Sequence, residues 1–286
     1  MKKIILSLFY FFNCNSINPN TDIIKLGMNA GHFSNRTDKI DTLVMHYTVS
    51  NMARTLMHFF GDQGVVSANY IISEDGYIFK NIKKKFAAHH AGISYWNGKS
   101  KINANSLGIE HVNPGYKVYD DQPSGIRVKG SDKEWYPFTE EEIYSSIQLS
   151  KHLIEKFNII PENIVGHSDI APKRKEDPGP LFPWKKFAEN DIGAWPNFET
   201  SWRLDCFKDA IQKNNLEKWL TEHLHIWGYK LPDEQTSAED IIRSFQMHFR
   251  QDDISGIADL ETAAILNALI CNYKCINNKC PCTTLK

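Results

Sequence analysis

Two histidines and one aspartate are the residues of this chain best suited to bind a metal. His46 ends the apolar run Leu43-Val44-Met45, and His167 follows the short apolar run 164–166. Asp177 lies in a segment rich in proline and glycine, which we expect to be a loop rather than a helix. Each residue alone would more often be packed or solvated, but strand ends and loops are where sites are usually built. Two histidines and a carboxylate form a ligand set for zinc that leaves one position open to water.

Such a site could hydrolyse an amide bond at neutral pH. Zinc lowers the pKa of its bound water to about 7 and polarises a carbonyl group. Glu110 lies in a mostly apolar run, where a carboxylate needs a partner or a chemical role. We expect Glu110 to take the water proton and pass it to the leaving nitrogen, and Lys175 to add positive charge beside the oxyanion. The alternative is a Glu110–Lys175 ion pair that only ties a strand to a loop.

Four segments in order resemble the motifs of the zinc-dependent N-acetylmuramoyl-L-alanine amidases, and most closely those of the AmiD/AmpD type. The segments are the His46 strand and residues 88–96, 105–110 and 167–179. The resemblance implies the fold of peptidoglycan recognition proteins and cleavage between the lactyl group of N-acetylmuramic acid and L-alanine. It also implies a Zn²⁺ ion held by His46, His167 and Asp177, with Glu110 and Lys175 as catalytic residues.

The same resemblance predicts residues that bind the substrate, which would be peptidoglycan or a muropeptide. His90 and Trp96 are expected to line the cleft for the sugar and the stem peptide, with Trp96 offering an apolar face for stacking. Asn69 stands where several relatives carry histidine, so it is expected to affect substrate preference. Arg174 would either bind a stem-peptide carboxylate through its fork of donors or remain solvated.

The pattern of apolar residues around these positions predicts a mixed α/β domain, with a mixed central β-sheet flanked by helices. Strands are expected at 41–48, 68–72, 77–82, 107–112 and 164–166, with a hairpin turn at Asp75-Gly76. Apolar residues at helical spacing before Gly61 predict a helix. Thr139 and Glu142 form a capping-box pattern that opens a second helix, expected to cover one face of the sheet. Residues 115–137 are expected to form a long loop.

The pattern changes to short helices from about Ser201. Leucines repeat every fourth residue from Leu216, Ser237 with Asp240 opens a second helix, and a third follows Asp259. This region, 201–270, resembles a three-helix peptidoglycan-binding domain, although a generic helical bundle is the alternative. It contributes none of the expected site residues. A chain that ends near residue 197 is therefore expected to cleave small soluble muropeptides and to be less active than the full chain on insoluble sacculi.

Residues 1–20 resemble an export signal, with 21–197 as the catalytic domain. Two lysines precede the apolar run 4–12, which is too short to span a bilayer, and Cys14 follows it as the acylated cysteine of a lipoprotein would. The alternative is a strand that begins the chain. We expect a location in the cell envelope, periplasmic and, if Cys14 is lipidated, anchored in the outer membrane. The N-terminus is the only expected membrane attachment. Because the net charge is −1 and no basic stripe is visible, a nucleic-acid partner is not expected.

The tail, 271–286, carries Cys271, Cys275, Cys280 and Cys282. In an exported protein these cysteines suggest disulfides, with three alternative pairings, and the alternative is a second metal site.

Three classes of function compete: a zinc amidase, a wall-binding protein without catalysis, and an unrelated zinc peptidase. The peptidase signature H-E-x-x-H is absent from the chain. An exported amidase is favoured over one that recycles anhydro-muropeptides. The sequence leaves open the preference for intact or 1,6-anhydro muramyl ends, the stem peptide and the oligomeric state.

Overall fold

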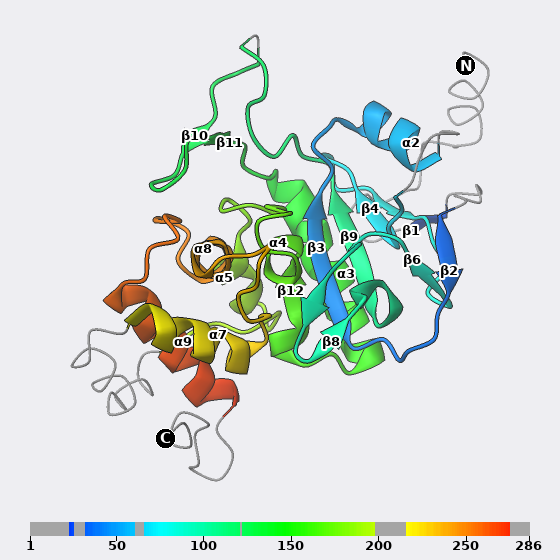
Figure 1. The fold of residues 1–286 in the computed structure, drawn as a ribbon. Helices are drawn as coiled ribbons and strands as arrows, with labels where there is room; N and C mark the ends of the chain where they lie inside the picture. The colour runs from blue at the N-terminus through cyan, green and yellow to red at the C-terminus, as the bar shows by residue number, and fades with distance from the viewer. Residues whose placement is uncertain (1–22, 26–31, 61–65, 121, 198–215, 275–286) are drawn as a thin grey trace.

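The computed structural model describes residues 23–25, 32–60, 66–120, 122–197 and 216–274 (Figure 1). Its centre is a six-stranded mixed sheet with the order β1-β5-β4-β9-β3-β12. The strands β4, β9, β3 and β12 run parallel, and the β4–β5 hairpin is antiparallel. The sheet strands are β1 (Ile23–Lys25), β3 (Thr42–Tyr47), β4 (Tyr70–Ile72), β5 (Ile78–Lys80), β9 (Ser106–His111) and β12 (Ile164–Gly166). The predicted mixed sheet and hairpin are confirmed.

The two faces of the sheet pack against different layers. Side chains alternate along β3, so Leu43 and Met45 join the helix α3 (Glu140–Phe157) in one cluster, whereas Val44 and His46 face the other side. The Thr139 hydroxyl caps α3 by accepting a hydrogen bond from the backbone N–H of Glu142. The prediction that this helix covers one face of the sheet is confirmed. The helices α2 (Met52–Phe60) and α5 (Trp184–Ala188) complete this part.

Two segments expected to be loops contain short elements. Residues 115–137 include the ladder of β10 (Ile126–Arg127) and β11 (Glu134–Trp135), because Trp135 buries its ring beside Tyr47. Residues 167–170 form a one-turn helix, α4 (His167–Ile170), because the Asp169 carboxylate accepts the backbone N–H of Gly166. The remaining short elements are β2 (Phe33–Asn35), β6 (Phe86–Ala88), β7 (Tyr95–Trp96), β8 (Lys99–Ser100), η1 (Ile102–Ala104) and η2 (Pro161–Asn163).

Within the described residues 216–274 the chain forms three helices, as predicted: α7 (Leu216–Trp227), α8 (Ala238–Phe249) and α9 (Leu260–Tyr273). Helix α8 packs against α4, and α7 packs against both α8 and α9 (Figure 1). Val44, Val165 and Ile170 belong to the same buried apolar cluster as residues of all three helices. The helical region therefore shares a continuous core with the sheet. Because α9 extends to Tyr273, Cys271 lies on this helix and not in the tail.

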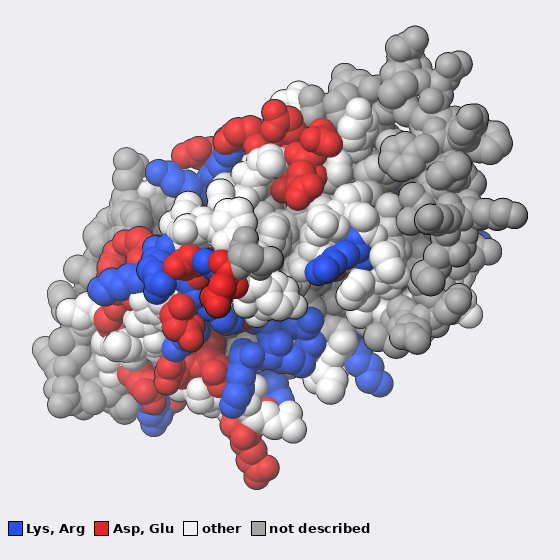
Figure 2. All heavy atoms as spheres, turned by 90° about the horizontal axis from the view of Figure 1, so that it is seen from above, with Lys and Arg blue, Asp and Glu red and all other residues white. Residues whose placement is uncertain are grey.

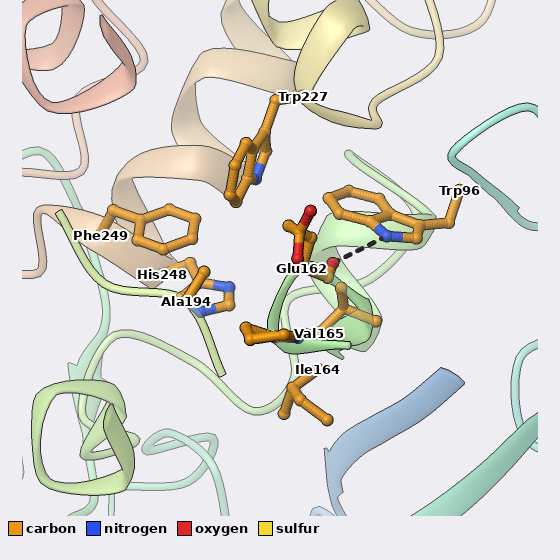
Figure 3. A pocket seen from close by; sticks show the side chains of 9 residues that line it. Trp96, Glu162, Ile164, Val165, Ala194, Trp227, His248 and Phe249 are labelled. Carbon is orange, nitrogen blue, oxygen red and sulfur yellow. Dashed lines mark hydrogen bonds between the residues drawn. The ribbon is translucent and has the colours of Figure 1, made fainter. Parts of the chain in front are cut away.

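Figure 3 shows a small pocket at the boundary between β12 and the helical region. Trp96 approaches it from β7, Val165 from β12, and Trp227 and Phe249 from α7 and α8. The indole N–H of Trp96 donates to the carbonyl of Glu162 at 3.1 Å. Aromatic rings from distant parts of the chain thus fill the boundary and join the two regions.

On the face drawn in Figure 2, lysines and arginines lie beside aspartates and glutamates. Within the described ranges, no helix has the length and apolarity needed to cross a membrane. The predicted export signal, including Cys14, lies outside the described residues, as do Cys275, Cys280 and Cys282.

Candidate active site

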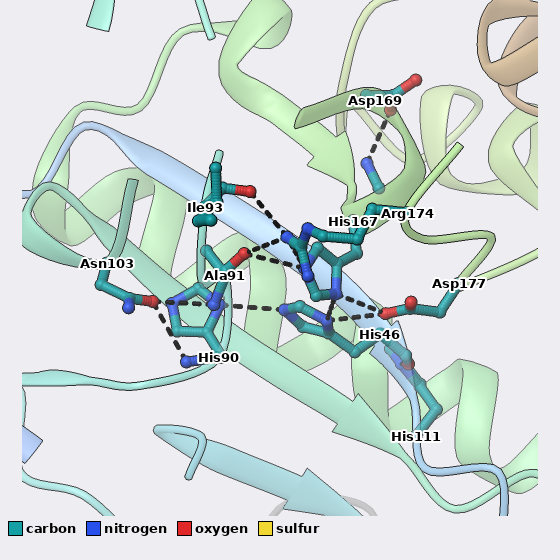
Figure 4. Close-up of polar contacts among 11 residues, drawn as sticks. His46, His90, Ala91, Ile93, Asn103, His111, His167, Asp169, Arg174 and Asp177 are labelled. Atoms are coloured by element: carbon teal, nitrogen blue, oxygen red, sulfur yellow. Dashed lines mark hydrogen bonds and ion pairs between the residues drawn. The ribbon is translucent and has the colours of Figure 1, made fainter. Parts of the chain in front are cut away.

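The three residues predicted as metal ligands lie together at one end of the central strands (Figure 4). His46 is near the end of β3, His167 begins α4, and Asp177 follows in the next loop. The two Nδ1 atoms are 3.0 Å apart, and Oδ2 of Asp177 lies 2.8 Å from Nδ1 of His46 and 3.0 Å from Nδ1 of His167. All three side chains are buried. Parallel pairing of β3 with β12 and β9 places these chain segments side by side.

A chain of hydrogen bonds determines which nitrogen of His46 carries the proton. The Ser106 hydroxyl donates to the carbonyl of Ile102 at 2.5 Å, so its oxygen accepts from Nε2 of His90 at 3.0 Å. Burial lowers the pKa of His90 well below its usual value, so His90 is neutral and its Nδ1 is an acceptor. His46 must then donate from Nε2 to His90 at 2.9 Å. The Nδ1 atom of His46 is left with a free lone pair.

The protonation of His167 follows from a similar contact. Its Nε2 lies 3.0 Å from the carbonyl of Ala91, which can only accept. Nε2 therefore carries a proton, so in the neutral imidazole Nδ1 presents its lone pair toward Asp177. In that form, two nitrogen lone pairs and one carboxylate oxygen converge, and none of these three atoms can donate a hydrogen bond to another. A bound cation would stabilise such a cluster, and ligand atoms of these types suit zinc.

The charges within this cluster act on one another. Burial, together with the neighbouring His167, lowers the pKa of His46 to about 4, although Asp177 opposes the shift. Burial alone would raise the pKa of Asp177, but the two histidines hold it below its usual range. At neutral pH, His46 is therefore an uncharged imidazole and Asp177 a carboxylate, which are the forms that bind a metal.

Glu110 lies opposite His46 in the register of β9 with β3. The residue is 9% exposed, and its buried Oε2 has no hydrogen-bond partner in the described part of the chain. Burial and the charge of Asp177 raise the pKa of Glu110 well above its usual value, while Lys175 opposes this shift. The structure describes both Glu110 and Lys175 and shows no ion pair between them, which disfavours the purely structural reading of the pair. A buried carboxylate without a partner beside a metal cluster is suited to proton transfer.

The four residues expected to bind substrate all take part in internal contacts. Asn69 is fully buried and bonds to the backbone of Gly108 and Ile82. His90 is 7% exposed and orients His46, as described above.

Trp96 and Arg174 also make internal contacts, although Arg174 remains exposed and lines a pocket. Trp96 is 3% exposed and packs edge-on against Tyr229, with ring centroids 5.0 Å apart, so its ring has no face free for a saccharide. Arg174 donates from Nη2 to the carbonyls of Ala91 (2.6 Å) and Ile93 (2.7 Å). Because Ala91 also accepts from His167, Arg174 stabilises the backbone that orients this ligand.

Sequence reasoning missed a further histidine behind the ligands. His111, the last residue of β9, donates from Nδ1 to the carbonyl of His46 at 2.8 Å and accepts at Nε2 from the hydroxyl of Ser146 on α3 at 2.7 Å. Burial lowers the pKa of His111 to about 4, so it stays neutral. It joins the end of β3 to α3. Only its position next to Glu110 in an apolar strand could have drawn attention to it.

A mixed sheet that carries a buried His-His-Asp cluster beside a carboxylate without a partner defines a hydrolase with a candidate metal site. The chain belongs to the N-acetylmuramoyl-L-alanine amidase family, which matches residues 36–180. It is 35% identical over 246 residues to the N-acetylmuramoyl-L-alanine amidase AmiD of Escherichia coli K12, an alignment that covers 82% of this chain and 84% of AmiD.

Two solved structures extend the similarity to most of the fold. The complex of Escherichia coli AmiD with anhydro-N-acetylmuramic acid-L-Ala-D-γ-Glu-L-Lys matches with a TM-score of 0.69 and 34% identity, covering 82% of this chain and 90% of that one. AmpDh3 of Pseudomonas aeruginosa in complex with an anhydromuramic pentapeptide matches with a TM-score of 0.70 and 30% identity, covering 91% and 99%. Both alignments are longer than the family match, so the similarity includes part of the helical region.

Proposed function

We propose that this protein is a zinc amidase that cleaves the bond between the lactyl group of N-acetylmuramic acid and the L-alanine of the peptidoglycan stem peptide. The observation that carries the proposal is the convergence of three metal-binding lone pairs beside the partnerless carboxylate of Glu110. A wall-binding protein without catalysis would need neither a complete ligand set nor this carboxylate. The muropeptides bound to the two related structures support the choice of substrate.

The residues of the chain have separate roles in this proposal. His46, His167 and Asp177 would hold zinc, which supplies Lewis acidity and lowers the pKa of a bound water to about 7. Glu110 accepts the proton of the attacking water and delivers it to the nitrogen of the departing alanine. Lys175 contributes positive charge where the carbonyl oxygen becomes negative. His90, Arg174 and the backbone of Ala91 orient the two histidines.

The protein would act on the cell wall from within the bacterial envelope. The lysine-flanked apolar run 4–12 supports export, and Cys14 is a candidate site for lipid attachment to the outer membrane. The helical region, through its resemblance to peptidoglycan-binding domains, would add affinity for the insoluble polymer. Cleavage of anhydro-muropeptides for recycling is the second candidate role, supported by the ligands of the related structures.

Mass spectrometry of the products from defined muropeptides tests the function. Incubation with a muramyl tetrapeptide should release the free tetrapeptide and leave N-acetylmuramic acid with its lactyl carboxylate. Parallel reactions with the 1,6-anhydro form would rank the two substrates. Unchanged muropeptide, or cleavage within the peptide, would contradict the proposal.

A further inference from the structure

Asp169 links the turn that carries a metal ligand to the helical region. It lies two residues after His167, and its side chain is 1% exposed. Its Oδ2 accepts the backbone N–H of Gly166 at 2.7 Å and lies 2.7 Å from Nδ1 of His248. Its Oδ1 accepts the hydroxyl of Tyr229 at 2.5 Å. Two of the three contacts of this buried carboxylate thus come from the region that sequence reasoning treated as a separate module.

The two partners of Asp169 are held firmly by their own surroundings. Tyr229, two residues after the end of α7, is fully buried and packs edge-on against Trp96. Burial and the carboxylate of Asp169 raise the pKa of Tyr229, so its hydroxyl keeps the proton that it donates. His248, on α8, stacks on Trp184 with ring centroids 3.8 Å apart. Ring packing against Trp96 and Trp184 therefore holds both groups in place in addition to their contacts with Asp169.

The turn that Asp169 anchors connects both sides of the metal cluster. The backbone N–H of Ser168 donates to the carbonyl of Asp177 at 2.8 Å, so the turn and the Asp177 loop move together. A Cβ atom added to Gly166 would lie 2.8 Å from Pro178, which shows how closely the two segments approach. Productive sites hold their groups to within about 0.5 Å, and a displacement of about 1 Å can cost about 10²-fold in rate. A shift of this turn would displace His167 and Asp177 at once.

We propose that Asp169 is a positioning residue for the metal site and that the helical region completes this site by supplying the hydroxyl of Tyr229 and the imidazole of His248. The proposal rests on the proposed function, because it takes His167 and Asp177 as zinc ligands. It replaces the expectation that a chain ending near residue 197 keeps its activity on small muropeptides. Removal of the helices would leave the buried carboxylate of Asp169 with only the backbone N–H of Gly166.

The test compares zinc affinity and ligand geometry in full-length variants. Tyr229→Phe removes one oxygen and keeps the buried ring. We expect a decrease in zinc affinity of about tenfold, at the lower end of the range for groups that support metal ligands. The visible spectrum of the Co²⁺-substituted protein, which reports coordination geometry, should change as well. In an Asp169→Asn background, Tyr229→Phe should have a smaller effect, because the two residues act through one contact.

Tyr70→Phe is the matched control, since Tyr70 is also buried, at 1% exposure, but lies in the sheet away from this turn. It should leave the zinc affinity and the cobalt spectrum unchanged. His248→Leu provides the same test if Tyr229→Phe does not fold. Wild-type zinc affinity and an unchanged spectrum in the folded variants would overturn the positioning role while the zinc amidase stands. A wild-type protein that binds no zinc would instead overturn the proposed function, and the positioning role with it.

Discussion

Replacement of His90 tests how the chain prepares His46 to bind zinc. His90→Leu removes the nitrogen that accepts the Nε2–H of His46. His90→Asn introduces a side chain branched like leucine, but its amide oxygen can accept that N–H. With zinc bound to Nδ1, His46 must carry its proton on Nε2. In the metal-free His90→Leu variant, the proton of His46 can instead lie on Nδ1, which then donates to Asp177. Loss of the acceptor therefore penalises the metal-bound form alone.

The size of this penalty follows from the burial of His46. A buried N–H without an acceptor costs about 1–3 kcal/mol, and each 1.4 kcal/mol changes an equilibrium constant about tenfold. The zinc affinity of His90→Leu should therefore fall about 10- to 100-fold, which matches the usual effect of removing the partner of a ligand histidine. His90→Asn should recover most of this loss.

Zinc dissociation constants, measured by competition with a chelating indicator, provide the assay. His223→Leu is a suitable control, because His223 is also buried but lies on α7 outside the site. It should bind zinc as the wild type does. If folded His90→Leu also retained wild-type affinity, the hydrogen-bond chain from Ile102 to His46 would not control the protonation of His46, and our reasoning would be refuted.

Three further predictions concern catalysis and stability. Glu110→Gln should keep the zinc and lose about 10²–10⁴-fold in kcat, the scale of a positioned acid–base group, and near wild-type turnover would contradict its role. Lys175→Met should lower kcat about 10²-fold or more with zinc content unchanged, in steady-state assays on a defined muropeptide, whereas an increase in KM alone would contradict its role beside the oxyanion. Leu224→Ala, at a fully buried site in the shared core, should lower the free energy of unfolding by about 2–5 kcal/mol. Denaturant unfolding should then show one transition for the whole chain, and separate melting of the helical region would contradict the continuous core.

The sheet and the metal cluster could be predicted because their signals are local. Alternation along 41–48 and 107–112 indicates strands, and His46 and His167 stand out because each ends an apolar run. The helices α3, α8 and α9 begin at the capping residues Thr139, Ser237 and Asp259. Such patterns extend over a few residues, so they can be recognised without knowledge of the tertiary structure.

The supporting contacts could not be predicted because they join distant positions. Tyr229 and His248 reach Asp169 across 60 and 79 residues, and no local pattern indicates such a contact. Trp96 has the kind of side chain that often lines a cleft. Whether its ring faces a substrate or other side chains depends on tertiary packing, which the sequence does not show. The β10–β11 ladder was missed because two-residue strands are too short to show alternation.

Removal and restoration of the metal, with activity measured at each step, tests most directly whether catalysis depends on zinc. The purified protein should contain about one equivalent of zinc, and chelation should abolish release of the peptide from a muramyl peptide. Addition of zinc should restore this activity in the wild type, but not in His167→Ala, which lacks one ligand. Full activity in a preparation shown by elemental analysis to be free of metal would contradict the account.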